Sequence, residues 1–136
     1  MSSTVMWNFN LSVLNGPSVS VSSPAGLAVD AYDSINVAIA NDGNPHTIQI
    51  VPVTSTDTIS FLMVSSSQYD QSGTTPSQTF QYTVGSSATE ITLDGPQFMM
   101  SGALVGLFPA AVTTITFTNK TANPANVSIL VGRKAS

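Results

Sequence analysis

His46 is the only histidine in the 136-residue chain, so a Ser-His-Asp relay could be built on this side chain alone. It follows Pro45 in a segment rich in turn-forming residues, and the chain has no G-x-S-x-G motif, which would expose a nucleophilic serine. We therefore expect His46 to be a turn residue. The sequence predicts no enzyme and no catalytic residue.

Glu90 and Asp94 are the two carboxylates whose spacing can be compared with the acid pair of a glycoside hydrolase. On an extended strand, four positions at about 3.3 Å per residue separate them by roughly 13 Å. That separation is too large for either the retaining or the inverting mechanism. Both residues are expected to be solvated, one on a strand and one in the turn that follows.

Two oxygen-rich segments offer the ligand type that Ca²⁺ prefers. Asp70-Gln71-Ser72-Gly73-Thr74 has side-chain oxygens at alternate positions, and Asp30 and Asp33 lie across a possible turn. Neither has the spacing of a calcium-binding loop with its late glutamate, and the chain has no cysteine for a thiolate site. Turn and surface roles are favoured, and no metal or cofactor is predicted.

Charged residues make up only 7% of the chain, against roughly 25% in soluble domains. Seven acids and three bases give a net charge of −4, and the bases are Lys120, Arg133 and Lys134. With so few cations, a nucleic-acid partner is not expected. An apolar content of 42% excludes a disordered polyelectrolyte.

The N-terminal segment 1–8 has neither a basic region nor an uninterrupted apolar region, so no Sec-type signal peptide is predicted. The longest apolar segment, 98–112, contains serine, glycine and proline and is shorter than the roughly 20 residues of a membrane-spanning helix. We expect a protein that is made in the cytoplasm, is used in or assembled from that compartment, and has no membrane span.

Serine and threonine form about a quarter of the chain, whereas Glu, Lys and Arg, which favour helices, are scarce. Apolar and polar residues alternate, as is typical of strands with one buried face. The first alternating segment is expected to bury one side, formed by Val5, Trp7, Phe9, Leu11 and Val13. Seven further alternating segments follow at 35–39, 48–50, 59–63, 80–84, 91–93, 115–117 and 127–131.

About eight short strands with regular turn signals predict an all-β chain with a single domain over 1–136. The expected architecture is an antiparallel two-sheet β-sandwich of jelly-roll or immunoglobulin-like topology. Segment 98–109 is compatible with a short helix or with a strand buried on both faces, so its class stays open.

Two parts of the chain echo each other, 35–50 and 113–129. Each has an alternating strand ending in asparagine, a short loop, an Asn-Pro pair and a second alternating strand. The pattern predicts a β-hairpin in each part. Similar turn chemistry and internal duplication both explain the echo.

The second of these parts, 115–129, resembles the hairpins of small β-sandwich proteins of phage virions, such as capsid decoration and fibre-associated subunits. With its earlier echo, the resemblance covers two segments of the chain. It implies a non-enzymatic protein that binds copies of itself and a virion surface. No residue with a known role is carried over.

The scarcity of charged residues favours a role in protein–protein contact over a role in catalysis, because soluble monomers use surface charge to resist association. Interface cores are depleted in charge and enriched in aromatic residues and methionine. The candidate interface residues are Met6, Trp7, Phe98, Met99, Met100 and Phe108. Our hypothesis is a structural subunit that self-assembles with itself and other particle proteins, as a coat or capsid decoration protein of a virion. A cellular filament or shell subunit fits the same composition.

A carbohydrate-binding or adhesive β-sandwich is the alternative, with a glycan as partner. Its rings and hydrogen-bonding groups would come from Tyr32, Tyr69, Tyr82, Asp33, Asp70 and Gln81. Adjacent strand residues point to opposite faces, so Gln81 and Tyr82 are not expected to serve one site.

Overall fold

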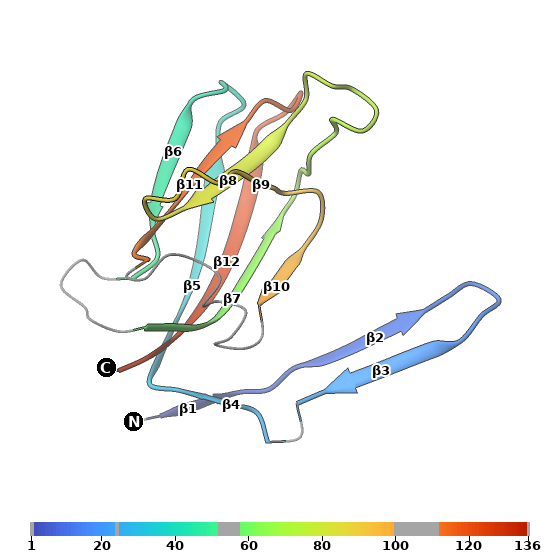
Figure 1. Ribbon diagram of the computed structural model, residues 1–136, viewed down its shortest axis with the longest axis vertical. Helices are drawn as coiled ribbons and strands as arrows, with labels where there is room; N and C mark the ends of the chain where they lie inside the picture. The colour runs from blue at the N-terminus through green and yellow to red at the C-terminus, as the bar shows by residue number, and fades with distance from the viewer. Residues whose placement is uncertain (1, 24, 52–57, 100–111, 136) are drawn as a thin grey trace.

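The computed structural model describes residues 2–23, 25–51, 58–99 and 112–135. These residues form twelve β-strands and no helix, and every strand pairing is antiparallel (Figure 1). The prediction of an all-β chain is confirmed. Of segment 98–109, the part up to residue 99 lies in a strand, and the rest falls outside the described residues.

Eight strands form two four-stranded sheets, which we call the body. The first sheet has the order β10–β7–β12–β5, and its strands are β5 (Ala31–Ile39), β7 (Thr58–Ser66), β10 (Gln97–Met99) and β12 (Ala125–Lys134). The second has the order β6–β11–β8–β9, and its strands are β6 (Pro45–Gln49), β8 (Phe80–Val84), β9 (Ile91–Thr92) and β11 (Thr114–Asn119).

The pairings of the body are nested. β8 pairs with β9, β7 with β10, β6 with β11, and β5 with β12. The body therefore doubles back once, at the β8–β9 turn, and its second half returns along its first. The strands expected at 80–84 and 91–93 pair with each other as β8 and β9, and the turn after β8 contains Gly85, whose φ is positive.

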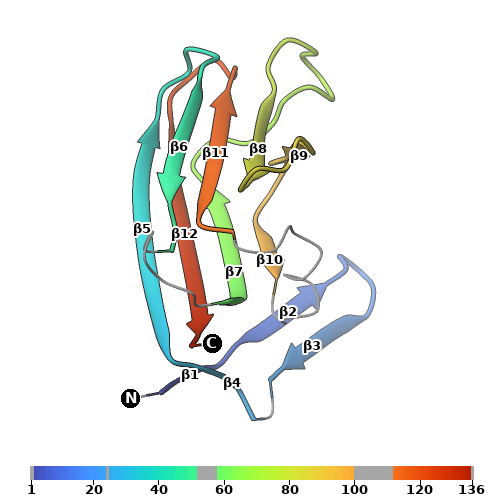
Figure 2. The same cartoon turned by 60° about the vertical axis from the view of Figure 1, so that its left-hand side comes forward.

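One hydrophobic core lies between the two sheets of the body (Figure 2). Alternate residues of β11 and β12 point into it, because successive side chains of a strand project to opposite faces. The second sheet adds three packed rings, with Phe117 lying 6.2 Å from Phe80 and 5.5 Å from Tyr82 between centroids. The core residues are Ile39, Ile50, Val51, Leu62, Val64, Phe80, Tyr82, Val84, Leu93, Ile115, Phe117, Ala125, Val127, Ile129 and Val131.

The prediction of two hairpins from the internal echo is wrong. β5 and β6 lie in different sheets, as do β11 and β12, and the two echoing parts pair with each other instead. Their loops are joined by hydrogen bonds from Asn41 Nδ2 to Ala122 O (3.0 Å) and from Gly43 N to Asn119 O (3.1 Å). An Asn and Pro turn signature marks a chain reversal, and it does not distinguish a hairpin from a crossing between sheets.

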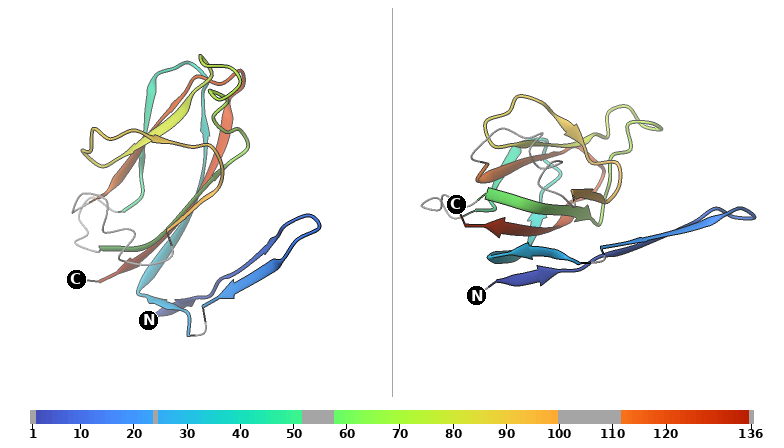
Figure 3. Two further views of the ribbon diagram at one scale, coloured as in Figure 1. Left: turned by 45° about the vertical axis from the view of Figure 1, so that its right-hand side comes forward. Right: turned by 60° about the horizontal axis from the view of Figure 1, so that its bottom comes forward.

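The remaining four strands precede the body and form two two-stranded sheets, which we call the arm (3–29). Its strands are β1 (Ser3–Val5), β2 (Asn8–Ser12), β3 (Ser18–Ser22) and β4 (Leu27–Val29). β1 pairs with β4 and β2 with β3, so the arm is a long hairpin with an irregular break in its middle. The β2–β3 half projects away from the body (Figures 1 and 3).

The strand count differs from the expected eight for reasons of local structure. The single strand expected at the N-terminus is divided into β1 and β2, and β3, β4 and β10 are additional. The break between the two halves of the arm includes Gly26, whose φ is +68°, a left-handed conformation that L side chains rarely adopt.

The root of the arm crosses the first sheet at a point where only glycine fits. A Cβ at Gly132 would lie 2.9 Å from Val29 Cγ1 and 3.3 Å from Phe61 Cβ. Val29 is buried there, and the neighbouring Asp30 N–H donates to Arg133 O at 2.8 Å. These contacts fix where the arm leaves the body.

Candidate functional surface

The projecting half of the arm is amphipathic because of its register. Phe9 lies opposite Val21 and Leu11 opposite Val19. Cross-strand partners share a face, so these side chains form one apolar side. The other side is polar and consists of Asn8, Asn10, Ser12, Ser18, Ser20 and Ser22.

The apolar side is covered only near its base. Phe9 packs edge-on against Phe98 of β10, with ring centroids 4.9 Å apart, and Trp7 lies 5.6 Å from Phe9. Beyond these rings the hairpin extends away from the two sheets of the body (Figure 3). The four residues that follow, which we call the arm face, are largely exposed: Leu11 (68%), Val13 (62%), Val19 (53%) and Val21 (48%).

The tip of the arm is a well-defined turn. Val13 N–H donates to Pro17 O at 3.1 Å and Gly16 N–H to Val13 O at 2.9 Å, while Asn15 has a φ of +60°. The turn presents Leu14, which is 92% exposed. No residue between 1 and 29 is charged, since Asp30 is the first ionisable side chain of the sequence.

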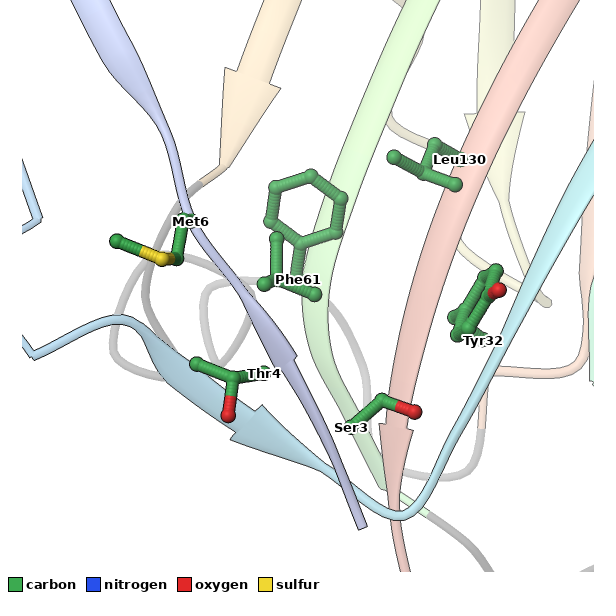
Figure 4. A pocket seen from close by; sticks show the side chains of 7 residues that line it. Ser3, Thr4, Met6, Tyr32, Phe61 and Leu130 are labelled. Atoms are coloured by element: carbon green, nitrogen blue, oxygen red, sulfur yellow. The ribbon is translucent and has the colours of Figure 1, made fainter.

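A hollow of about 360 Å³ lies between the arm root and the first sheet, on the side of the sheet that faces away from the core (Figure 4). Met6 and Val5 of the arm line one side of it, and Tyr32, Phe61 and Leu130 line the sheet side. None of its lining residues is charged. The hollow is therefore a second uncharged surface, close to where the arm begins.

The predicted interface residues fall in different environments. Met6 is 72% exposed, Phe98 is 40% exposed and packs against Phe9, and Trp7 is partly buried at the base of the arm. Met99 is partly buried and packs against the core of the body. Met100 and Phe108 lie outside the described residues.

Reasoning from the sequence missed the arm face. The expectation that the first strand buries one side is wrong for Leu11 and Val13, which are exposed. The signal that could have located the hairpin is the alternation of serine and valine over 18–22, which follows the turn residues Asn15, Gly16 and Pro17.

His46 lies in an exposed pair rather than in a relay. Its Nε2 is 3.0 Å from Asp42 Oδ1. The side-chain hydrogen bond with His46, followed by the Asn44 backbone N–H, lowers the pKa of Asp42 from 3.8 to about 2. No nucleophile is hydrogen-bonded to the ring among the described residues. The expectation of a turn position is wrong, because His46 lies in strand β6 opposite Phe117 of β11, just after the loop that carries Asp42.

The Asp70 carboxylate closes its own loop. Its Oδ1 accepts hydrogen bonds from the N–H and hydroxyl of Ser72, and its Oδ2 accepts one from Phe80 N–H at 2.7 Å. Burial acts to raise the pKa of Asp70, but these hydrogen bonds outweigh it and hold the pKa below 3.8. The carboxylate is thus occupied by donors that fix a turn.

Asp30 and Asp33, the other candidate ligands for Ca²⁺, also accept hydrogen bonds from the chain itself. Asp33 Oδ2 accepts a hydrogen bond from Arg133 Nη2 at 2.7 Å, and Asp30 Oδ2 accepts one from Ala135 N at 2.8 Å. Glu90 and Asp94 are both exposed. The described part of the chain contains no group of three or more residues that could hold a metal ion.

The three tyrosines proposed for stacking on sugars do not share a surface. Tyr82 is buried in the core, where its hydroxyl donates to Gln97 Oε1 at 2.5 Å and burial raises its pKa to about 12. Tyr69 packs against the core, and its hydroxyl accepts from Ser66 N–H at 3.1 Å. Tyr32 is exposed, beside the hollow.

Across the described ranges there is no helix long and apolar enough to cross a membrane. The chain matches no protein-family model, no curated protein and no solved structure, so its surfaces are interpreted from their own geometry.

Proposed function

We propose that the protein is a non-enzymatic structural subunit that self-assembles, with the arm face as its contact surface for a second copy. The observation that carries this proposal is the amphipathic β2–β3 hairpin, whose apolar side continues past the part covered by Phe98. A two-stranded hairpin is marginally stable in water unless its apolar face is packed against something. A second copy supplies that packing.

The composition of the arm favours a partner as poorly charged as the chain itself. Exposed apolar residues rimmed by polar ones mark contact surfaces, and interface cores are depleted in charge. The arm face is surrounded by serine and asparagine and lies in a segment with no charged residue. Docking against an uncharged surface of another copy, such as its arm, therefore desolvates no ion.

For the body we propose a two-sheet β-sandwich of jelly-roll topology, made of the eight strands β5–β12. The nested pairing and the crossing of the chain between two four-stranded sheets support this topology over an immunoglobulin-like one. Jelly rolls are used in viral capsids and in lectins. Together with the arm, this supports a role as a coat or decoration subunit of a virus or phage particle, with a cellular filament or shell subunit as the alternative.

Sedimentation velocity of the purified chain tests self-assembly. The wild type should sediment as more than one 14.1 kDa chain at micromolar concentration, increasingly so as concentration rises. The double variant Leu11→Ser/Val19→Ser should sediment as a single chain, because it makes the centre of the arm face polar. The exchange Asn10→Ser/Ser20→Asn alters the opposite side of the same hairpin and should assemble like the wild type.

A wild type that stays a single chain at all concentrations contradicts the proposal, as does a double variant that assembles normally. Negative-stain electron microscopy of the assembled wild type then separates the two roles. Closed shells or flat lattices support a coat subunit, and open filaments support the filament alternative.

A further inference from the structure

We propose that the hollow beside the arm root is the receptor for the arm tip of the next copy, so that the subunits join head to tail. This inference rests on the proposed function and adds to it the acceptor surface and the geometry of the contact. Leu14 is the inserted side chain, and Met6, Tyr32, Phe61 and Leu130 are the receiving ones.

The tip is suited to insertion because it is both apolar and rigid. Leu14 is 92% exposed, and the turn that carries it is closed by the two backbone hydrogen bonds between Val13, Gly16 and Pro17. A group held in its bound conformation loses little conformational entropy on binding. Leu14 can therefore enter a pocket without ordering a loop.

The hollow is suited to receive an apolar group. Its volume of about 360 Å³ falls within the range of pockets that bind small molecules, so it has room for aliphatic side chains. The register places Tyr32 and Phe61 on either side of Gly132, which Val29 of the arm root covers. Leu130 lies one pleat further along β12 on the same face.

The tip cannot occupy the hollow of its own chain. Met6 lines the hollow, and Leu14 is eight residues further along the arm, roughly 26 Å away at about 3.3 Å per extended residue. The turn also lies at the far end of the arm from its root (Figure 1). A tip that fills the hollow therefore belongs to a second copy.

The arm and the hollow lie on the same side of the molecule. The arm occupies a layer outside the β10–β7–β12–β5 sheet, with Phe9 turned toward that sheet, and the hollow opens into the same layer (Figures 3 and 4). An arm that extends beneath a neighbouring copy therefore presents its apolar side to the neighbour's sheet. Tip and hollow are different surfaces, and the proposal is that each copy donates its tip to one neighbour and receives the tip of another. Such a heterologous contact continues into a ring or a chain of subunits, whereas a reciprocal exchange of arms would stop at two chains.

Two complementary variants test this contact. Leu14→Asp damages the tip and leaves the hollow intact, and Tyr32→Asp damages the hollow and leaves the tip intact. Each places a carboxylate in the contact, where burying an unpaired charge is strongly unfavourable. Both residues are exposed, so the far-UV circular dichroism of each variant should match the wild type.

Sedimentation velocity should show each variant alone as a single chain and an equimolar mixture as two chains, because only one intact tip and one intact hollow remain per pair. Leu14→Met and Tyr32→Phe, which preserve apolar shape, should assemble like the wild type. Wild-type protein should exceed two chains.

The inference is overturned if Leu14→Asp and Tyr32→Asp assemble like the wild type, if their mixture stays monomeric, or if the wild type stops at two chains. The proposed function survives these results when Leu11→Ser/Val19→Ser still abolishes assembly. A wild type that never assembles overturns both.

Discussion

The body and the arm are built from the same residue pattern, yet their apolar residues end in opposite environments. In β12, Val127, Ile129 and Val131 alternate with other residues and are buried by the facing sheet. In β3, Val19 and Val21 alternate with serine in the same way and are exposed. The difference lies in what faces the strand. The pattern therefore identifies the apolar side of a strand, but it does not identify which part of the protein buries that side.

A body core residue should give the largest loss of stability. Phe117 is fully buried between Phe80 and Tyr82, so Phe117→Ala should lower the free energy of unfolding by about 3–5 kcal/mol. Urea unfolding followed by far-UV circular dichroism measures this change. A loss below about 1 kcal/mol would show that the body core is not the main source of stability.

The junction between arm and body should be the next most sensitive point. Gly132→Ala places a Cβ 2.9 Å from Val29 Cγ1, so the arm root must shift, at a cost of about 1–3 kcal/mol. Thermal unfolding measures the cost, and the emission of Trp7, the only tryptophan, reports the displaced arm.

Gly73→Ala is the matched control, because a Cβ there meets nothing within 4 Å. The control should leave both signals unchanged. An equal effect of the two substitutions would argue against a close crossing at Gly132.

The alternating residues allowed the strands of the body other than β10 to be predicted, and serine and threonine in place of helix formers indicated the all-β class. The pairing of β5 with β12 could not be predicted, because a period of two says nothing about which distant strand lies alongside. The Asn-Pro turns were equally ambiguous. For the arm, Leu11 has the same sequence signature as a core residue, and only the structure shows that nothing in the described chain covers it.

The loop locked by Asp70 should give a smaller, pH-dependent effect. Asp70→Asn removes acceptor capacity for Ser72 and Phe80 and should cost about 1 kcal/mol near neutral pH. Because the pKa of Asp70 is lowered by folding, the stability from its carboxylate is present above about pH 4 and is lost as pH falls through the folded pKa.

Urea titrations of the wild type and Asp70→Asn from pH 7 to pH 2.5 check the sign. The difference between the two proteins should shrink with acid. A difference that stays constant or grows would contradict the hydrogen-bonded carboxylate.

The arm face should contribute least to the stability of the body. At a dilution where both proteins are monomeric, Leu11→Ser/Val19→Ser should change the free energy of unfolding by less than about 0.5 kcal/mol, since the replaced side chains are already exposed. Chemical unfolding at that dilution measures this. A loss comparable to that of Phe117→Ala would mean that the arm belongs to the core.

The central claim is that the body buries its own apolar side chains, whereas those of the arm are buried by another copy. Amide hydrogen exchange at two protein concentrations tests this claim most directly. Peptides from β2 and β3 should exchange rapidly in dilute protein and become protected at high concentration, whereas peptides from β11 and β12 should be protected equally at both. Arm peptides whose exchange does not depend on concentration would contradict the account.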